Sequence, residues 1–166
     1  CVSHTESPPP HWWHSQASAL GVPGRRQGRG ARIDLRAARR LPPDHGRSAG
    51  KVTLVNFWAT SCVTCVAEMP EVVATYNKYH AQGFDTLAVA MSYDPPSYVV
   101  NFAETRKLPF KVAIDNTGAV AQAWGDVKLT PSTFIVNKRG EIVKSYVGAP
   151  DFPELHKLIE RLLAET

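Results

Sequence analysis

The stretch VTLVNFWATSCVTC, residues 52–65, decides the fold class of this chain. Its first half, Val52–Trp58, is a mostly apolar run rich in β-branched and aromatic residues, the pattern of a strand buried on both faces. Further along, apolar residues recur at the helical spacing of a core-facing helix: Met69, Val72, Val73 and Tyr76. The sequence therefore predicts a buried strand that passes into a helix, with Cys62 and Cys65 at the junction.

The remaining pattern alternates in the same way. Further strands are expected at 84–91, 111–114, 132–136 and 141–147, and further helices at 94–107, 119–124 and from Asp151 onward. Asp94 is expected to cap its helix, with Pro95 in the first helical position. A turn with Gly140 joins the last two strands as a hairpin. The order β-α-β-α-β-α-β-β-α predicts an α/β domain with a central mixed sheet flanked by helices.

The first 50 residues differ from the rest in composition. They hold eight arginines and three acids, a balance of +5, whereas residues 51–166 carry −1 of the total charge of +4. Segment 1–50 is low in complexity and rich in Arg, Pro and Gly, which predicts a poorly structured, disordered extension. An alternative explanation of this composition is that part of segment 1–50 does not belong to the natural protein. We place the domain at 51–166, where the near-neutral charge argues against a nucleic-acid partner.

Two features of the extension bear on anchoring and metals. No apolar run is long enough for a membrane helix, so the only membrane attachment that the sequence suggests is an N-terminal anchor at Cys1, as in bacterial lipoproteins. The absence of Met before Cys1 fits such a processed N-terminus, and a truncated sequence would explain it equally well. His11 and His14 form only half of a metal site, and no third ligand is evident. We therefore expect no bound metal.

The spacing of Cys62 and Cys65 indicates redox chemistry. A thiol at a helix N-terminus meets the positive end of the helix dipole, which stabilises the thiolate and lowers its pKa. Cys62 is then the nucleophile, and Cys65, one turn later, is the resolving thiol that closes a disulfide. The alternative is half of a zinc site, but the domain offers only His80 and His156 as further ligands, and they are not paired in spacing.

Two motifs resemble a known family. The segment VNFWATSCVTCVAEMP, residues 55–70, resembles the active-site segment of the TlpA/ResA-like thioredoxins of the AhpC/TSA–redoxin superfamily, and TPSTFIV, residues 130–136, resembles their cis-proline loop and the strand after it. The resemblance covers about residues 51–166 and implies a thioredoxin-like fold. This sequence departs from the family pattern at Ser61, where tryptophan is usual, and at Thr64, where proline is common.

The resemblance also implies the remaining site residues. Thr130, Pro131, Ser61 and Trp58 would contact the substrate, with a cis bond before Pro131. Asn56 stands where thioredoxin itself has a buried acid, so a proton relay must use water or Glu68, one turn beyond Cys65. Three alternatives stay open on general grounds: a trans Pro131, a solvated Glu68, and a core position for Trp58.

The function expected from these features is thiol-disulfide exchange with protein substrates. The resemblance implies a monomeric reductant in the bacterial periplasm or cell envelope, in cytochrome c maturation or a related process, fed by an upstream thiol donor. The redox-active disulfide would be its only redox group, with no separate cofactor. Two alternatives are a thiol peroxidase, disfavoured by the cysteine spacing, and a module that delivers Cu(I) through the two thiolates.

Overall fold

A computed structural model of the chain describes residues 50–166, so the expectations for the N-terminal extension, Cys1, His11 and His14 included, lie outside the described residues. The strands are β1 (Val52–Trp58), β2 (Phe84–Ala90), β3 (Lys111–Ile114), β4 (Ser132–Val136) and β5 (Ile142–Val147). The helices are α1 (Val63–Tyr79), α2 (Pro96–Thr105), α3 (Ala119–Ala123) and α4 (Phe152–Ala164), with a short 3₁₀ turn, η2 (His80–Gln82). The predicted α/β order is confirmed.

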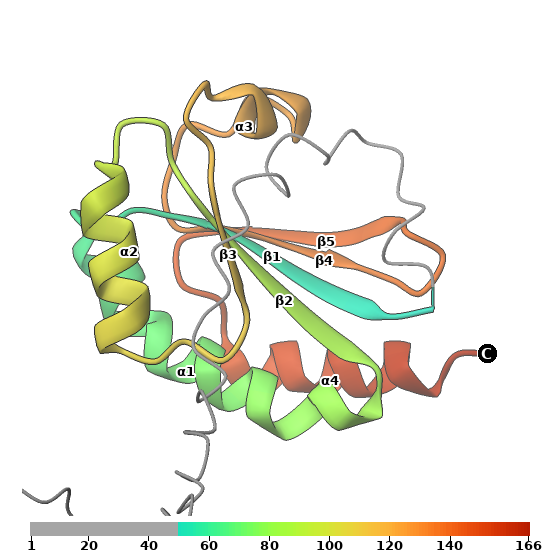
Figure 1. Cartoon of the computed structure of the whole chain (residues 1–166). Helices are drawn as coiled ribbons and strands as arrows, with labels where there is room; N and C mark the ends of the chain where they lie inside the picture. Colours follow the sequence, from blue (N-terminus) through green and yellow to red (C-terminus); the bar gives the residue numbers. More distant parts are fainter. Residues whose placement is uncertain (1–49) are drawn as a thin grey trace, which may run out of the picture.

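The five strands form one mixed sheet in the order β3-β2-β1-β4-β5, with β1 at its centre (Figure 1). β1 runs parallel to β2 and antiparallel to β4, and β2 runs parallel to β3. Every residue of β1 is buried, as the apolar run predicts, because the strand is covered on both faces. The loop after β1 therefore leaves the most deeply enclosed strand of the sheet.

Helices cover both faces of this sheet. On one face, residues of α1, α2 and α4 pack against alternate residues of the strands, including Leu54 and Trp58 of β1. On the other face, α3 packs through Val120 and Ala121 against Val55 and Phe57. Figure 1 shows α1 and α4 side by side below the sheet and α3 above it. The alternation of side chains along β1 thus divides the core into two layers.

The predicted cap of α2 is wrong. The N-cap residue is Pro95, without a side-chain cap, and the helix starts at Pro96. Asp94 is buried, and its carboxylate accepts instead from Thr60, at 2.7 Å from the backbone N–H and 2.5 Å from the hydroxyl. The predicted cap of α4 is confirmed, since the Asp151 carboxylate accepts from the Glu154 N–H at 3.0 Å. The strands predicted at 52–58, 111–114 and 132–136 have the expected bounds, and the remaining boundaries differ from expectation by at most two residues.

Within residues 50–166, no helix combines the length and the apolar character that a membrane crossing requires. The described domain thus contains no bilayer-spanning helix.

Candidate redox site

The site is built where β1 passes into α1. After Trp58, residues 59–61 turn the chain, and the Cys62 N–H donates to the Ala59 carbonyl at 3.1 Å. The bonds from Thr60 to Asp94 tie this turn to the segment that follows β2. Cys62 then occupies the N-cap position of α1. The local sequence thus fixes the backbone on both sides of the first cysteine.

Cys62 and Cys65 are joined by a disulfide, with Cα atoms 5.2 Å apart. The Cys62 Sγ also accepts the backbone N–H of Cys65 at 3.2 Å, which is the capping bond of α1. The two cysteines differ in exposure, because Cys62 is half-buried whereas Cys65 is 0% exposed. Of the two cysteines, only Cys62 is therefore partly exposed to a reacting partner, while Cys65 is enclosed by the core.

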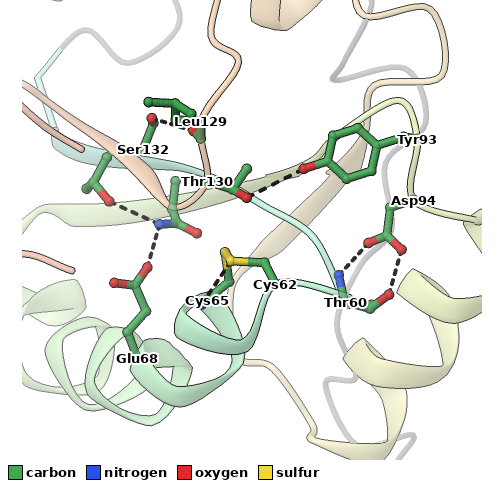
Figure 2. The surroundings of a disulfide bond; sticks show 11 residues. Thr60, Cys62, Cys65, Glu68, Tyr93, Asp94, Leu129, Thr130 and Ser132 are labelled. Atoms are coloured by element: carbon green, nitrogen blue, oxygen red, sulfur yellow. Dashed lines mark hydrogen bonds between the residues drawn. A yellow bond between two sulfur atoms is a disulfide. The ribbon is translucent and has the colours of Figure 1, made fainter. Parts of the chain in front are cut away.

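Glu68 lies below the disulfide in Figure 2, one helical turn beyond Cys65. It is 5% exposed, so the alternative of a solvated Glu68 is wrong. Its Oε1 accepts from the Asn56 Nδ2 at 3.0 Å, and the same amide donates to the Thr133 hydroxyl at 3.0 Å. Burial raises the pKa of Glu68 to about 7, against the lowering effect of the Asn56 hydrogen bond.

This carboxyl group retains an unused oxygen. Glu68 Oε2 is buried and has no hydrogen-bond partner among residues 50–166, and the same holds for the Oδ1 of Asn56. A carboxyl group with a pKa near neutrality and a free oxygen is suited to taking up and releasing a proton. The network joins three elements, β1, β4 and α1, and Figure 2 shows its Glu68 end below the disulfide.

The loop before β4 lies near the disulfide in Figure 2. The Thr130–Pro131 peptide bond is cis, so the predicted isomer is confirmed and the trans alternative is wrong. Two hydrogen bonds hold the loop, from the Ser132 hydroxyl to the Leu129 carbonyl at 2.7 Å and from the Gly148 N–H to the Pro131 carbonyl at 2.8 Å. The loop is thereby fixed to both the start of β4 and the end of β5.

Tyr93 is a neighbour that the sequence did not indicate. Its hydroxyl lies 3.5 Å from the Thr130 hydroxyl, although 37 residues separate them in the chain. Tyr93 is 58% exposed, and in Figure 2 its ring lies on the opposite side of the disulfide from Glu68. The only signal for it in the sequence is an aromatic residue just after a strand that ends at the same edge of the sheet as β1.

The predicted substrate-contact residues differ in accessibility. Ser61 is exposed beside Cys62, Thr130 is half-buried, and Pro131 is buried, so that Thr130 forms the accessible part of the cis-proline loop. Trp58 is 0% exposed and packs on Phe102 with ring centroids 5.0 Å apart, so its side chain offers no surface to a substrate. The substrate-contact role of Trp58 is therefore wrong, and its alternative as a core residue is correct. Trp58 is buried because it is the last residue of β1, a strand that is covered on both faces.

No three metal-ligating side chains of His, Cys, Asp or Glu gather anywhere in the described domain, residues 50–166. His80 and His156 are engaged elsewhere, His80 with the Tyr76 carbonyl and His156 with the Thr75 hydroxyl. Neither histidine of residues 50–166 is thus a ligand of the cysteine pair in this arrangement.

Comparisons with known proteins agree with this geometry. The model of the redoxin family matches residues 44–159. The thiol-disulfide oxidoreductase ResA of Halalkalibacterium halodurans is 33% identical over 116 residues, which is 70% of this chain and 65% of that protein. ResA of Bacillus subtilis is 32% identical over 107 residues, 64% of this chain and 59% of that protein. The chain thus spans slightly less than two thirds of the length of the curated relatives that it matches.

Solved structures show the same fold. The solution structure of a candidate thioredoxin from Neisseria meningitidis superimposes with a TM-score of 0.69 at 41% identity, covering 73% of this chain and 80% of that one. The crystal structure of a candidate thiol:disulfide interchange protein DsbE from Chlorobium tepidum gives a TM-score of 0.64 at 27% identity, covering 72% and 84%. The predicted thioredoxin-like fold is therefore confirmed.

Proposed function

The chain belongs to the redoxin family, and on that premise we propose that it is a thiol-disulfide oxidoreductase that acts on protein substrates through Cys62 and Cys65. The observation that carries the proposal is the disulfide at the start of α1, with one accessible and one buried cysteine. In dithiol exchange the accessible sulfur meets the partner, and the shielded sulfur resolves the mixed disulfide.

The reaction starts from the reduced protein. The Cys62 thiolate attacks one sulfur of a partner disulfide; a bond forms between Cys62 and that sulfur, the partner disulfide breaks, and the second partner sulfur leaves as a thiolate that takes up a proton. At Cys62, the Cys65 N–H and the start of α1 stabilise the thiolate before attack.

The second step releases the partner. Cys65 loses its proton and attacks the Cys62 sulfur; the mixed disulfide breaks, the Cys62–Cys65 disulfide forms, and the partner leaves with both of its sulfurs reduced. Glu68 is the proton acceptor in this proposal, because it is buried one turn beyond Cys65 and its Oε2 is free among residues 50–166. Two electrons pass to the partner, and an upstream thiol donor restores the dithiol.

We extend the proposal to the place and direction of the reaction. The relatives named thiol-disulfide oxidoreductase ResA and thiol:disulfide interchange protein DsbE support exchange with disulfides. The resemblance to the TlpA/ResA-like family favours a reductant of protein disulfides in the bacterial cell envelope, in cytochrome c maturation or a related process. Ser61, Thr130 and Pro131 flank the cysteine pair as substrate contacts in this proposal. Protein thiols and disulfides are its partners, and the disulfide is its only redox group.

The reduction potential of the Cys62–Cys65 couple tests the proposal. Equilibration with dithiothreitol or glutathione, read by the mass shift on thiol alkylation, is expected to give a value near that of thioredoxin, about −270 mV. A value near −120 mV would reverse the direction of electron flow. Absence of a reversible two-electron couple, together with retention of Cu(I) or turnover of peroxide, would favour one of the alternative functions instead.

Two cysteine variants test the division of roles. Cys65→Ser is expected to trap a mixed disulfide between Cys62 and a partner, whereas Cys62→Ser is expected to trap none, because only Cys62 is accessible. The trapped species is measured by intact mass spectrometry. Equal trapping by both variants would contradict the assignment of Cys62 as the attacking cysteine.

A further inference from the structure

A groove lies beside the redox disulfide, between the turn that precedes Cys62 and one face of α2. Its volume is about 500 Å³. One wall is the turn, and the other is formed by residues spaced three or four apart on the helix, which therefore share a face. The lining residues are Thr60, Ser61, Tyr98, Asn101, Phe102, Thr105 and Arg106. Ser61 directly precedes the accessible cysteine.

The floor of the groove is layered. Buried Trp58 of β1 packs on Phe102 with the two rings tilted by 52°, and the Arg106 guanidinium lies over the Phe102 ring, 5.3 Å from its centroid. Stacking on an aromatic face leaves the in-plane N–H groups of a guanidinium free to bond. The core beneath thus supports a cation at the rim of the groove.

The groove offers donors but no carboxylate of its own. Among residues 50–166, Arg106 forms no salt bridge. No acidic residue lines the groove: Asp94, which braces the turn in its wall, is buried and satisfied by two bonds from Thr60, and the exposed Glu104 of α2 is not among the lining residues. Asn101, Thr105 and Tyr98 add an amide and two hydroxyls. This donor set is complementary to a carboxylate, which a guanidinium can bind through two parallel N–H bonds.

We propose that this groove is a subsite for a segment of the partner protein that carries an acidic side chain close to its reactive cysteine, with the carboxylate paired to Arg106. The proposal rests on the proposed function and names the class of partner that this site prefers. From Tyr98 to Arg106 the helix rises about 12 Å, the length of roughly four extended residues. Since Ser61, which directly precedes Cys62, lines the same groove as Arg106, a partner cysteine bonded to Cys62 can place a neighbouring acid in the groove.

The kinetic test uses matched peptides. Each carries one cysteine as a mixed disulfide with 5-thio-2-nitrobenzoate, and an aspartate or an asparagine placed one to four residues to either side. The reduced protein attacks the mixed disulfide and releases the coloured thiol, which gives the rate constant. At the best position we expect the aspartate peptide to react about three- to tenfold faster than its asparagine match, with a ratio that falls as salt is added.

Variants of Arg106 test whether the groove causes the preference for the aspartate peptide. Arg106→Gln is expected to bring the ratio close to one, and Arg106→Lys to retain part of it, because lysine keeps the charge but not the planar fork. Arg161→Gln is the matched control, since Arg161 is an exposed arginine on α4 that does not line the groove. Absence of any preference at every position, or an equal loss in Arg106→Gln and Arg161→Gln, would overturn the proposal.

A binding measurement separates this inference from the proposed function. Cysteine-free versions of the aspartate and asparagine peptides are titrated into the oxidised protein and followed by NMR. We expect the aspartate peptide alone to shift the amide signals of Ser61, Asn101 and Arg106. Binding without any exchange reaction would contradict the proposed function and support the subsite. Exchange with equal shifts from both peptides would overturn the subsite and leave the proposed function in place.

Discussion

At the scale of single residues, the unusual group is Glu68, a buried acid whose pKa is raised to about 7 by burial. The unfolded chain loses this proton near the ordinary value of 4.5, whereas the folded protein retains it until about pH 7. Between these values the folded state binds more protons than the unfolded state. The free energy of unfolding therefore falls as pH rises through this window, and the cost of the buried charge is complete above it.

Replacing Glu68 with Gln removes this cost. We expect Glu68→Gln to match the wild type in stability below pH 4.5 and to exceed it above pH 7 by about 3 kcal/mol, because one pKa unit corresponds to about 1.4 kcal/mol. Guanidinium unfolding across this pH range measures the difference. Glu154→Gln, at an exposed position, is the control. A difference in stability that does not vary with pH would contradict the raised pKa of Glu68.

Asn56 is the residue that positions Glu68. Its amide donates to the Glu68 carboxyl group, and this hydrogen bond lowers the pKa of Glu68. Asn56→Ala is therefore expected to raise the pKa of Glu68 above about 7 and to destabilise the fold by about 1–3 kcal/mol, the usual cost of leaving a buried polar group unpaired. Carbon-13 NMR of the Glu68 carboxyl group follows the titration.

Thr133→Val serves as the comparison for Asn56→Ala. It removes the second acceptor of the Asn56 amide and leaves the bond to Glu68 in place, so it should change the pKa of Glu68 less. A larger shift in Thr133→Val than in Asn56→Ala would show that the bond between Asn56 and Glu68 does not control this carboxyl group.

At the scale of elements, the turn between β1 and α1 depends on a residue from a distant segment. Asp94, expected from the sequence to cap α2, instead holds both the N–H and the hydroxyl of Thr60, two residues before Cys62. A capping motif is local and can be recognised in sequence, but competition from a partner 34 residues away is decided only by the tertiary fold. The turn that presents Cys62 is thus braced by the start of the neighbouring element.

Asp94→Ala is expected to loosen this turn. We expect a loss of stability of about 1–3 kcal/mol, from the unpaired groups of Thr60, and faster reduction of the disulfide by dithiothreitol, because a looser turn gives the reagent better access to half-buried Cys62. Asp151→Ala removes the cap of α4 far from the cysteines, and should cost about 1 kcal/mol with no change in the reduction rate. Equal reduction rates in both variants would show that Asp94 acts on stability alone.

The sequence predicted the elements better than it predicted their contacts. The run from Val52 to Trp58 and the spacing of Met69 and Val72 specify a strand and a helix because burial imposes periods that are visible locally. The burial of Glu68 could not be predicted, since it requires Asn56 and Thr133 from two other elements. Tyr93 meets Thr130 only because two loops reach the same end of the sheet.

At the scale of the whole molecule, folding and redox chemistry form one thermodynamic cycle. Reducing the disulfide has one free energy in the folded protein and another in the unfolded chain. The difference between these two values equals the difference in the free energy of unfolding between the oxidised and the reduced protein. A reductant forms its disulfide readily in the folded state. The proposed direction of electron flow therefore requires the oxidised protein to be the more stable form.

Paired guanidinium titrations test this requirement. Titrations are run with and without reductant, and we expect the oxidised protein to unfold at the higher guanidinium concentration. Its free energy of unfolding should exceed that of the reduced protein by about 1.4 kcal/mol for every 30 mV by which folding lowers the reduction potential. The Cys62→Ser, Cys65→Ser double variant, which cannot cycle, controls for effects of the reductant itself. A more stable reduced form would identify the protein as an oxidant.

The placement of β1 at the centre of the sheet has a consequence for hydrogen exchange. Its backbone amides lie between two neighbouring strands and beneath helices on both faces, so they exchange with solvent only when the domain opens as a whole. The edge strands β3 and β5 can open locally at much lower cost. We therefore expect β1, which leads to the cysteines, to be the slowest-exchanging segment of the described domain, and local opening of the edge strands to leave the reactive pair in place.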